Sequence, residues 1–252
     1  MLNVGAAQMV IDPPLPNDPQ GYVRRAGPAV EYGDSLLITS VVFEGPDCSA
    51  AILAADLAGQ DAVTADAMRA AVAAVIPVPA AHVLVNASHS HAAPFARADG
   101  MKLGGGSDYM TEGELAYIAW RPHDFASAAL LAWEARRPAR AAGGTGHGAG
   151  IAVNRRERTA DGRTILGWNQ EIGIDEDTPT IRIDDVDGEA VATITAFGCH
   201  PVVIGPEVAK TGSDFIGPLR RIVEDIRGCT FVFLQVAAVN VVPLEAFHDH
   251  DG

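Results

Sequence analysis

Two short histidine motifs follow apolar segments of this chain, and their side chains are suited to hold a metal ion. The first motif places His89 and His91 directly after the apolar run Val83–Val85. The second places His200 after the β-branched segment Ala190–Ala196. Neutral imidazole is the commonest protein ligand for zinc, and ligands gather where the strands of α/β sheets end. The two motifs therefore predict one composite metal site built from distant parts of the sequence.

The spacing of His89 and His91 leaves their individual roles open. Residues i and i+2 of an extended segment point to the same side, so both rings could face one site. Alternatively, one ring binds the metal while the other orients substrate or a ligand. His200 lies 111 residues after His89, and Pro201 biases it toward extended geometry. Each of the three could also be an ordinary hydrogen-bonded histidine near a strand end.

Other polar residues near these motifs allow more than one interpretation. Asp56 ends an apolar strand and could orient a histidine ring or cap a helix. Ser213 and Asp214 are typical of a helix N-cap. Arg155 could hold a carbonyl, carboxylate or phosphate group, or it could belong to a solvated basic loop. Cys199 is expected to be a buried small hydrophobe, with a metal ligand or reactive thiol as the alternative.

The residues that would position this site are distributed over strands and helices. Apolar, β-branched segments predict strands at 35–43, 49–55, 83–86, 180–184, 189–196 and 230–234. Capping and stop signals predict helices at 61–76, 111–133 and 213–227, with Pro122 expected to kink or split the second. The glycine-rich run Gly143–Gly148 is interpreted as a loop. This order favours a mixed α/β (α+β) fold, in which mixed sheets are flanked by helices, loops are long and the metal site lies at the carboxyl ends of strands.

Composition excludes several classes of function. The 252 residues carry 18 basic and 32 acidic side chains, a net charge of −14, and such a surface repels nucleic acid phosphates. No apolar run reaches the roughly 18–20 residues that a membrane span needs, and Met1–Gly5 lacks the features of a signal peptide. We therefore expect no nucleic acid partner, no transmembrane segment and a cytoplasmic location, or a secreted or periplasmic one if a leader has been removed. The chain also lacks the nucleophile motif of the α/β-hydrolases.

In order along nearly its whole length, the chain resembles the N-terminal catalytic domain of the neutral (non-lysosomal) ceramidases. The matching segments are Gly5–Ala7, Ile11–Pro14, Gly21–Tyr22, Arg24–Arg25, Asp56–Leu57, Ser88–Pro94, Asn154–Arg155, Ala196–Pro201 and Thr211–Gly217. Each motif is short, but their shared order makes the resemblance fairly specific. It implies that residues 1–252 form a single ceramidase-like catalytic domain, the N-terminal portion of a family domain that would continue beyond residue 252.

The resemblance also implies an activity and a set of site residues. The activity is zinc-dependent hydrolysis of an amide (N-acyl) bond in ceramide or a related small-molecule or lipid amide. Carried over by position, His89 and His200 would be zinc ligands, and His91 and Arg155 would be catalytic. Asn154 and Arg155 would bind substrate. Zinc chemistry fits this activity because zinc lowers the pKa of bound water to about 7 and polarises a carbonyl group.

One segment departs from the family pattern. Gln235–Pro243 occupies the place of a Gly-Asp-x-Ser/Asn-Pro segment, with Val236 and Val239 at its glycines, Asn240 at its Asp and Val242 at its Ser/Asn. Valine offers no side-chain hydrogen bond and disfavours the positive φ that glycine can adopt. Any polar contact made there in ceramidases would be missing, which argues against long-chain ceramide as the substrate.

The family's remaining zinc ligands, a Glu and a Tyr, lie downstream of the last residue of this sequence. Asp214, Asp56, Glu245 or the terminal histidines His248 and His250 could replace them, a second chain could supply them, or the chain could be a fragment or a decayed copy. These possibilities leave two functional hypotheses of different classes. The first is an amide hydrolase. The second is a non-catalytic or incomplete subunit of a hetero-oligomer, or a homo-oligomer, that needs another chain to complete the site. A metal-free binding protein is a third, weaker one.

Overall fold

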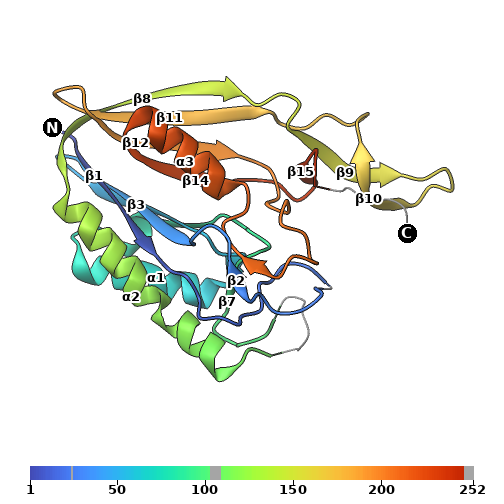
Figure 1. The fold of residues 1–252 in the computed structure, drawn as a ribbon. Helices are drawn as coiled ribbons and strands as arrows, with labels where there is room; N and C mark the ends of the chain where they lie inside the picture. The colour runs from blue at the N-terminus through green and yellow to red at the C-terminus, as the bar shows by residue number, and fades with distance from the viewer. Residues whose placement is uncertain (24, 103–108, 247–252) are drawn as a thin grey trace.

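The computed structural model describes residues 1–23, 25–102 and 109–246 and has the mixed α/β architecture that the sequence predicts (Figure 1). Its main sheet has eight strands in the order β14-β12-β11-β8-β1-β3-β4-β6. The strands are β1 (Asn3–Val10), β3 (Leu37–Glu44), β4 (Ser49–Ala55), β6 (Val83–Ala87), β8 (Arg137–His147), β11 (Asp177–Asp185), β12 (Ala190–Phe197) and β14 (Thr230–Gln235). β4 pairs with β6, and β12 with β14, in parallel, whereas the other neighbouring strands are antiparallel.

Three smaller sheets surround the ends of the main strands. A three-stranded antiparallel sheet contains β9 (Ala152–Arg158), β10 (Thr164–Asn169) and β15 (Val241–Pro243). Two parallel pairs join β2 (Glu31–Tyr32) to β13 (Lys210–Thr211) and β5 (Gly59–Gln60) to β7 (Phe95–Ala96). Because β15 follows β14 along the chain, its pairing with β9 brings Arg155 toward the carboxyl end of β14.

The main sheet folds back on itself, so that its two outermost strands meet. The side chain of Asn86 on β6 exchanges two hydrogen bonds of 3.0 Å with the backbone of Gln235 on β14. Apolar residues from both halves of the sheet share one buried core, which includes Val4, Val41, Ala54, Ile183, Ile194 and Val232. Residues that are distant in strand order, and more distant in sequence, therefore become neighbours.

Helices cover the two halves separately. A second core packs α1 (Ala62–Val75) and α2 (Glu112–Glu134) against β3, β4 and β6, below the sheet in Figure 1. Near α3 (Ile216–Arg227), Phe215, Leu219 and Val223 pack with Phe231 and Phe233 of β14. A short 3-10 helix, Ala80–His82, precedes β6. No helix in the described part of the chain is long and apolar enough to cross a membrane.

Three local predictions are wrong, each for a physical reason. The run Gly143–His147 is part of β8, because backbone pairing along β11 continues to His147 and needs no side chains. α2 is not split, since it continues through Pro122 as one helix in which buried residues such as Phe125 on either side of the proline pack against the core. α3 begins at Ile216 rather than Ser213, and Pro218 lies in its first turn, where backbone N–H groups lack intrahelical acceptors anyway.

Candidate metal centre

The three histidines of the two motifs converge on one point. Each of His89, His91 and His200 offers a ring nitrogen that lies within 4.8 Å of the other two. The Nε2 atoms of His89 and His91 are 3.4 Å apart. Imidazole nitrogens bound at about 2.1 Å to a tetrahedral zinc ion lie about 3.4 Å from one another. The three rings therefore offer a group of donor atoms that could hold a metal ion, and the His89–His91 spacing equals that of two ligands of one tetrahedral ion.

His89 is held by the loop that follows β4. Its Nδ1 lies 2.5 Å from the carbonyl oxygen of Ala58, and its backbone N–H donates to Leu57 O at 2.9 Å. We call Asp56–Ala58 the first platform. His89 has a φ of 66°, a left-handed conformation that is uncommon for residues with a side chain and often marks functional sites. Because Nδ1 carries the donated proton, the lone pair of Nε2 is free to face the cluster.

His200 is held in the same way by a segment from the other half of the sheet. Its Nδ1 lies 2.8 Å from the carbonyl oxygen of Ala238, and its backbone N–H donates to Val241 O at 2.9 Å. We call Ala238–Val241 the second platform. A backbone acceptor at the distal ring nitrogen is the usual way in which proteins fix the tautomer of a metal-binding histidine. Two rings of the cluster thus have the arrangement expected of ligands.

His91 lies among residues of the N-terminal loop. The ring of Tyr22 packs edge-on against it at 5.0 Å between centroids, and Arg25 Nη2 donates to the His91 carbonyl at 2.8 Å. A Cβ on Gly21, whose φ is 117°, would come within 2.6 Å of the His91 ring. The His91 Nδ1 is buried and has no hydrogen-bond partner among the described residues. Among the described residues, no backbone carbonyl therefore accepts from His91 Nδ1, in contrast to the Nδ1 atoms of His89 and His200.

Electrostatics keep the buried imidazoles neutral. Burial, the other two rings and the charges of Arg155 and Arg25 lower the pKa of His91 to about 3. Burial and Arg155 likewise lower the pKa of His200 to about 4. A neutral imidazole is the form that binds a metal ion, whereas a ring with so low a pKa is a weak base at neutral pH.

The structure separates the two residues of the Asn154–Arg155 motif. Arg155 is half-buried, its charge acts on His91 and His200, and its Nε donates to Val239 O at 2.9 Å. Asn154 is 2% exposed and its side-chain oxygen accepts from Arg156 N at 2.9 Å. Arg155 can therefore act on a group held by the cluster, whereas the side chain of Asn154 stabilises its own strand.

Other acidic residues that the sequence offered as ligands have different roles. Among the described residues, the Asp56 carboxylate neither caps a helix nor contacts a histidine ring directly, and it forms a buried ion pair with Arg220. The Asp214 carboxylate accepts from the backbone amides of Val203, Ile204 and Phe215, and so it ties down the loop after His200 rather than capping α3.

The remaining ligand candidates lie away from the cluster or cannot be placed. Glu245 is exposed and is not part of the group of ligand atoms found among the described residues. His248 and His250 lie outside the described part of the chain. Cys199 is buried, and burial raises the pKa of its thiol to about 12, as expected of a small apolar side chain.

The divergent segment after β14 adopts an ordinary backbone. Val242 is fully buried and packs with Val153 and Val202, whereas Val236 and Val239 are exposed. Among the described residues, only His89 and Asp214 are non-glycine residues with positive φ. The valines at the family's glycine positions are therefore not strained, and the segment still supplies the carbonyl that holds His200.

Sequence reasoning missed the contribution of the N-terminal loop. Gly21, Tyr22 and Arg25 were noted as matching motifs but received no role. A glycine beside an aromatic and a basic residue, in a loop far from any predicted strand, was the available signal. Only the folded chain shows that these residues enclose His91.

Comparison with solved structures identifies the fold. The chain is similar to neutral ceramidase from Pseudomonas aeruginosa, with a TM-score of 0.79 and 17% identity over 100% of this chain and 41% of that one. It is also similar to a ceramidase complexed with C2, with a TM-score of 0.74 and 17% identity over 96% of this chain and 38% of the other. No family model matches the chain, and no curated protein matches it. The chain thus has the ceramidase-like fold that its motifs predicted, and it spans about two fifths of the length of these ceramidase chains.

Proposed function

We propose that this protein is a metal-dependent hydrolase of an amide (N-acyl) bond and that its metal is zinc. The observation that carries the proposal is the group of three buried or half-buried histidines whose ring nitrogens lie within 4.8 Å of one another. The ceramidase-like fold supports the same reaction class. Fold alone does not specify function, so the chemistry of the site carries more weight than the likeness.

The proposed roles follow from the contacts of each residue. His89 and His200 bind the metal through Nε2, because backbone carbonyls occupy their Nδ1 atoms. We assign His91 to the third ligand position rather than to proton transfer. Its neutral ring has a pKa of about 3, and its Nε2 lies 3.4 Å from that of His89, the separation expected of two ligands of one tetrahedral ion. Zinc would supply a bound water of lowered pKa and would polarise the carbonyl.

Arg155 is the residue that we assign to the substrate. Among the described residues, its side chain donates a hydrogen bond through Nε, and the Nη groups would hold the amide oxygen by paired hydrogen bonds. A positive charge near that oxygen stabilises the negative charge that develops during hydrolysis. The substrate we propose is a lipid or small-molecule amide, by analogy with the ceramidases of similar fold. Asn154, which the resemblance assigned to substrate, would then act only by supporting the strand that carries Arg155.

Removal of individual histidines tests the proposal. We expect His89→Ala and His200→Ala to lower zinc affinity at least 100-fold, measured by competition titration of the full chain against a chromogenic chelator. His91→Ala should also weaken zinc binding, which separates a ligand from a proton carrier, because loss of a proton carrier lowers activity at unchanged metal content. His82→Ala is the matched control, since His82 is an exposed histidine that contacts Ser49 O. Zinc affinity that stays the same in all of these variants would overturn the proposal.

A chain that binds zinc but hydrolyses no amide would favour the second hypothesis, an incomplete subunit. Purification from the native source would then be expected to yield a stoichiometric partner chain. An active chain without a partner would reject that alternative.

A further inference from the structure

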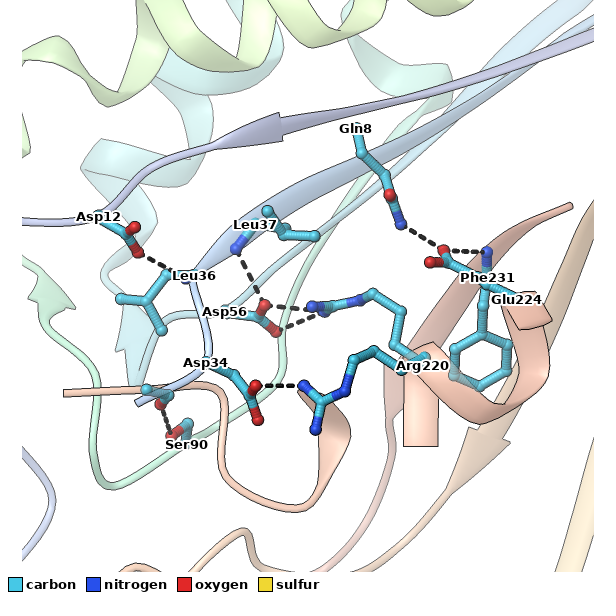
Figure 2. A network of polar contacts seen from close by, with 12 residues as sticks. Gln8, Asp12, Asp34, Leu36, Leu37, Asp56, Ser90, Arg220, Glu224 and Phe231 are labelled. Atoms are coloured by element: carbon cyan, nitrogen blue, oxygen red, sulfur yellow. Dashed lines mark hydrogen bonds and ion pairs between the residues drawn. The ribbon is translucent and has the colours of Figure 1, made fainter. Parts of the chain in front are cut away.

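A buried ion pair lies beside the metal centre without being part of it. Arg220 Nη2 on α3 lies 3.0 and 2.8 Å from the two carboxylate oxygens of Asp56. The backbone N–H of Leu37 donates to the same carboxylate at 2.9 Å, as Figure 2 shows. The side chains of Arg220 and Asp56 are 8% and 2% exposed. Asp56 is the first residue of the first platform, so the ion pair is attached to the loop that holds His89.

Fold stability does not account well for this pair. Removing two charges from water is costly, and apolar residues of similar volume often serve a fold as well or better. Burial raises the pKa of the Asp56 carboxyl. Arg220 and the backbone N–H of Leu37 lower this pKa, but they do not cancel the effect of burial. The Nε of Arg220 is also buried without a partner among the described residues. A pair with these costs is better explained by the geometry that it fixes.

The ion pair can fix the position of one half of the main sheet relative to the other. Through Leu219 and its neighbours, α3 packs against Phe233 of the half that supplies His200. Through Arg220, the same helix holds Asp56 at the end of β4, in the half that supplies His89 and His91. A second link in Figure 2 joins Gln8 of β1 to Glu224 of α3, at 2.6 Å. Beside the histidine cluster, α3 therefore fixes the position of one half of the sheet relative to the other.

The first platform transmits that position to His89. From Asp56 the chain runs directly into Leu57, whose carbonyl accepts the His89 backbone N–H, and Ala58, whose carbonyl accepts the ring proton. The left-handed conformation of His89 needs such outside constraint, because an L-residue does not prefer it. A shift of Asp56 would therefore move or rotate the His89 ring.

We propose that the Arg220–Asp56 ion pair positions His89 for metal binding by fixing the first platform relative to the half of the sheet that carries His200. Both are positioning residues and touch neither the metal nor the substrate. The inference rests on the proposed function, because it assumes that the histidine cluster binds a metal ion.

Metal affinity, measured apart from activity, tests this positioning role. Outer partners of metal-binding histidines typically change affinity about 10–100-fold, so we expect Arg220→Met to raise the dissociation constants for Zn2+ and Co2+ about tenfold. The visible spectrum of bound Co2+ should change as well, since it reports the ligand geometry. Arg121→Met is the matched control: Arg121 is 6% exposed on α2, pairs with Asp124 at 2.6 Å and stacks on Tyr117. It should lower thermal stability of the metal-free protein without changing metal affinity or the Co2+ spectrum.

The outcomes separate this inference from the proposed function. If the wild-type chain binds neither metal, the proposed function fails. If the wild type binds and folded Arg220→Met binds equally well, the positioning role is wrong. Equal weakening by Arg220→Met and Arg121→Met would also overturn it, because the effect would then reflect general instability. Should Arg220→Met fail to fold, Arg220→Lys decides: it retains the charge without the guanidinium, and we expect intermediate metal affinity, whereas wild-type affinity would refute the role.

Discussion

The first and second platforms hold equivalent histidines by different means. The first, Asp56–Ala58, combines backbone hydrogen bonds (Asp56 N–H to Leu37 O at 2.9 Å and Ala58 N–H to Pro94 O at 2.8 Å) with the buried Asp56–Arg220 ion pair, and it holds His89 in a left-handed conformation. The second, Ala238–Val241, is anchored by backbone: Asn240 O accepts from Arg155 N at 2.8 Å, and β15 pairs with β9. The contrast indicates that the first platform depends in part on a buried ion pair between side chains, whereas the second depends on close approach of main chains.

Among the substitutions that test this contrast, Gly198→Ala should have the largest effect on stability and zinc affinity. A Cβ at Gly198 would lie 2.6 Å from the carbonyl oxygen of Ala237, immediately before the second platform. Overpacking of this kind costs about 1–3 kcal/mol, and we expect the free energy of unfolding to fall by about 2 kcal/mol in chemical denaturation. Displacement of the neighbouring Ala238 carbonyl should also weaken zinc binding about tenfold.

The control for Gly198→Ala is Gly144→Ala in β8, where a Cβ would meet no atom within 4 Å. We expect stability to change by less than about 0.5 kcal/mol and zinc affinity to stay the same. A Gly198→Ala protein that matches this control would show that the second platform is not held by close main-chain packing.

Gly59→Ala applies the same change next to the first platform. Here the new Cβ would lie 2.5 Å from Cε2 of Phe95, near the outer edge of a side chain that can rotate away. We expect a loss of about 1 kcal/mol in stability and no change in zinc affinity. Zinc binding that weakens as much as in Gly198→Ala would remove the distinction between the two platforms.

Val239→Ala should have the smallest effect. Val239 is 68% exposed, and the contact it makes with Arg155 uses its carbonyl oxygen. Exposed substitutions of this kind usually change stability by less than about 0.5 kcal/mol, and we expect thermal melting and zinc titration to match the wild type. A clear loss of zinc affinity would assign a role to the side chain, and not only to the backbone, of the divergent segment.

Local sequence signals located the strands well where side chains pack in the core. β4 has the predicted bounds Ser49–Ala55, β12 differs from its predicted range by one residue at each end, and β14 differs by one residue at its carboxyl end. β8 was misread because its glycine-rich part, Gly143–Gly146, lies on the surface and is held by backbone pairing with β11, which leaves no apolar pattern in the sequence. The role of Asp56 was unpredictable because Arg220 lies 164 residues away.

By itself, the sequence determined the mixed α/β architecture, the ceramidase-like fold and the positions of the histidine motifs after strands. These features depend on local patterning, on short motifs and on composition. Only the tertiary structure decided that His91 joins His89 and His200, that two backbone carbonyls fix the tautomers of the latter pair, and that Arg220 reaches Asp56. The physical reason is that the main sheet folds until β6 meets β14, and this closure depends on apolar burial summed over the whole chain, which no local segment encodes.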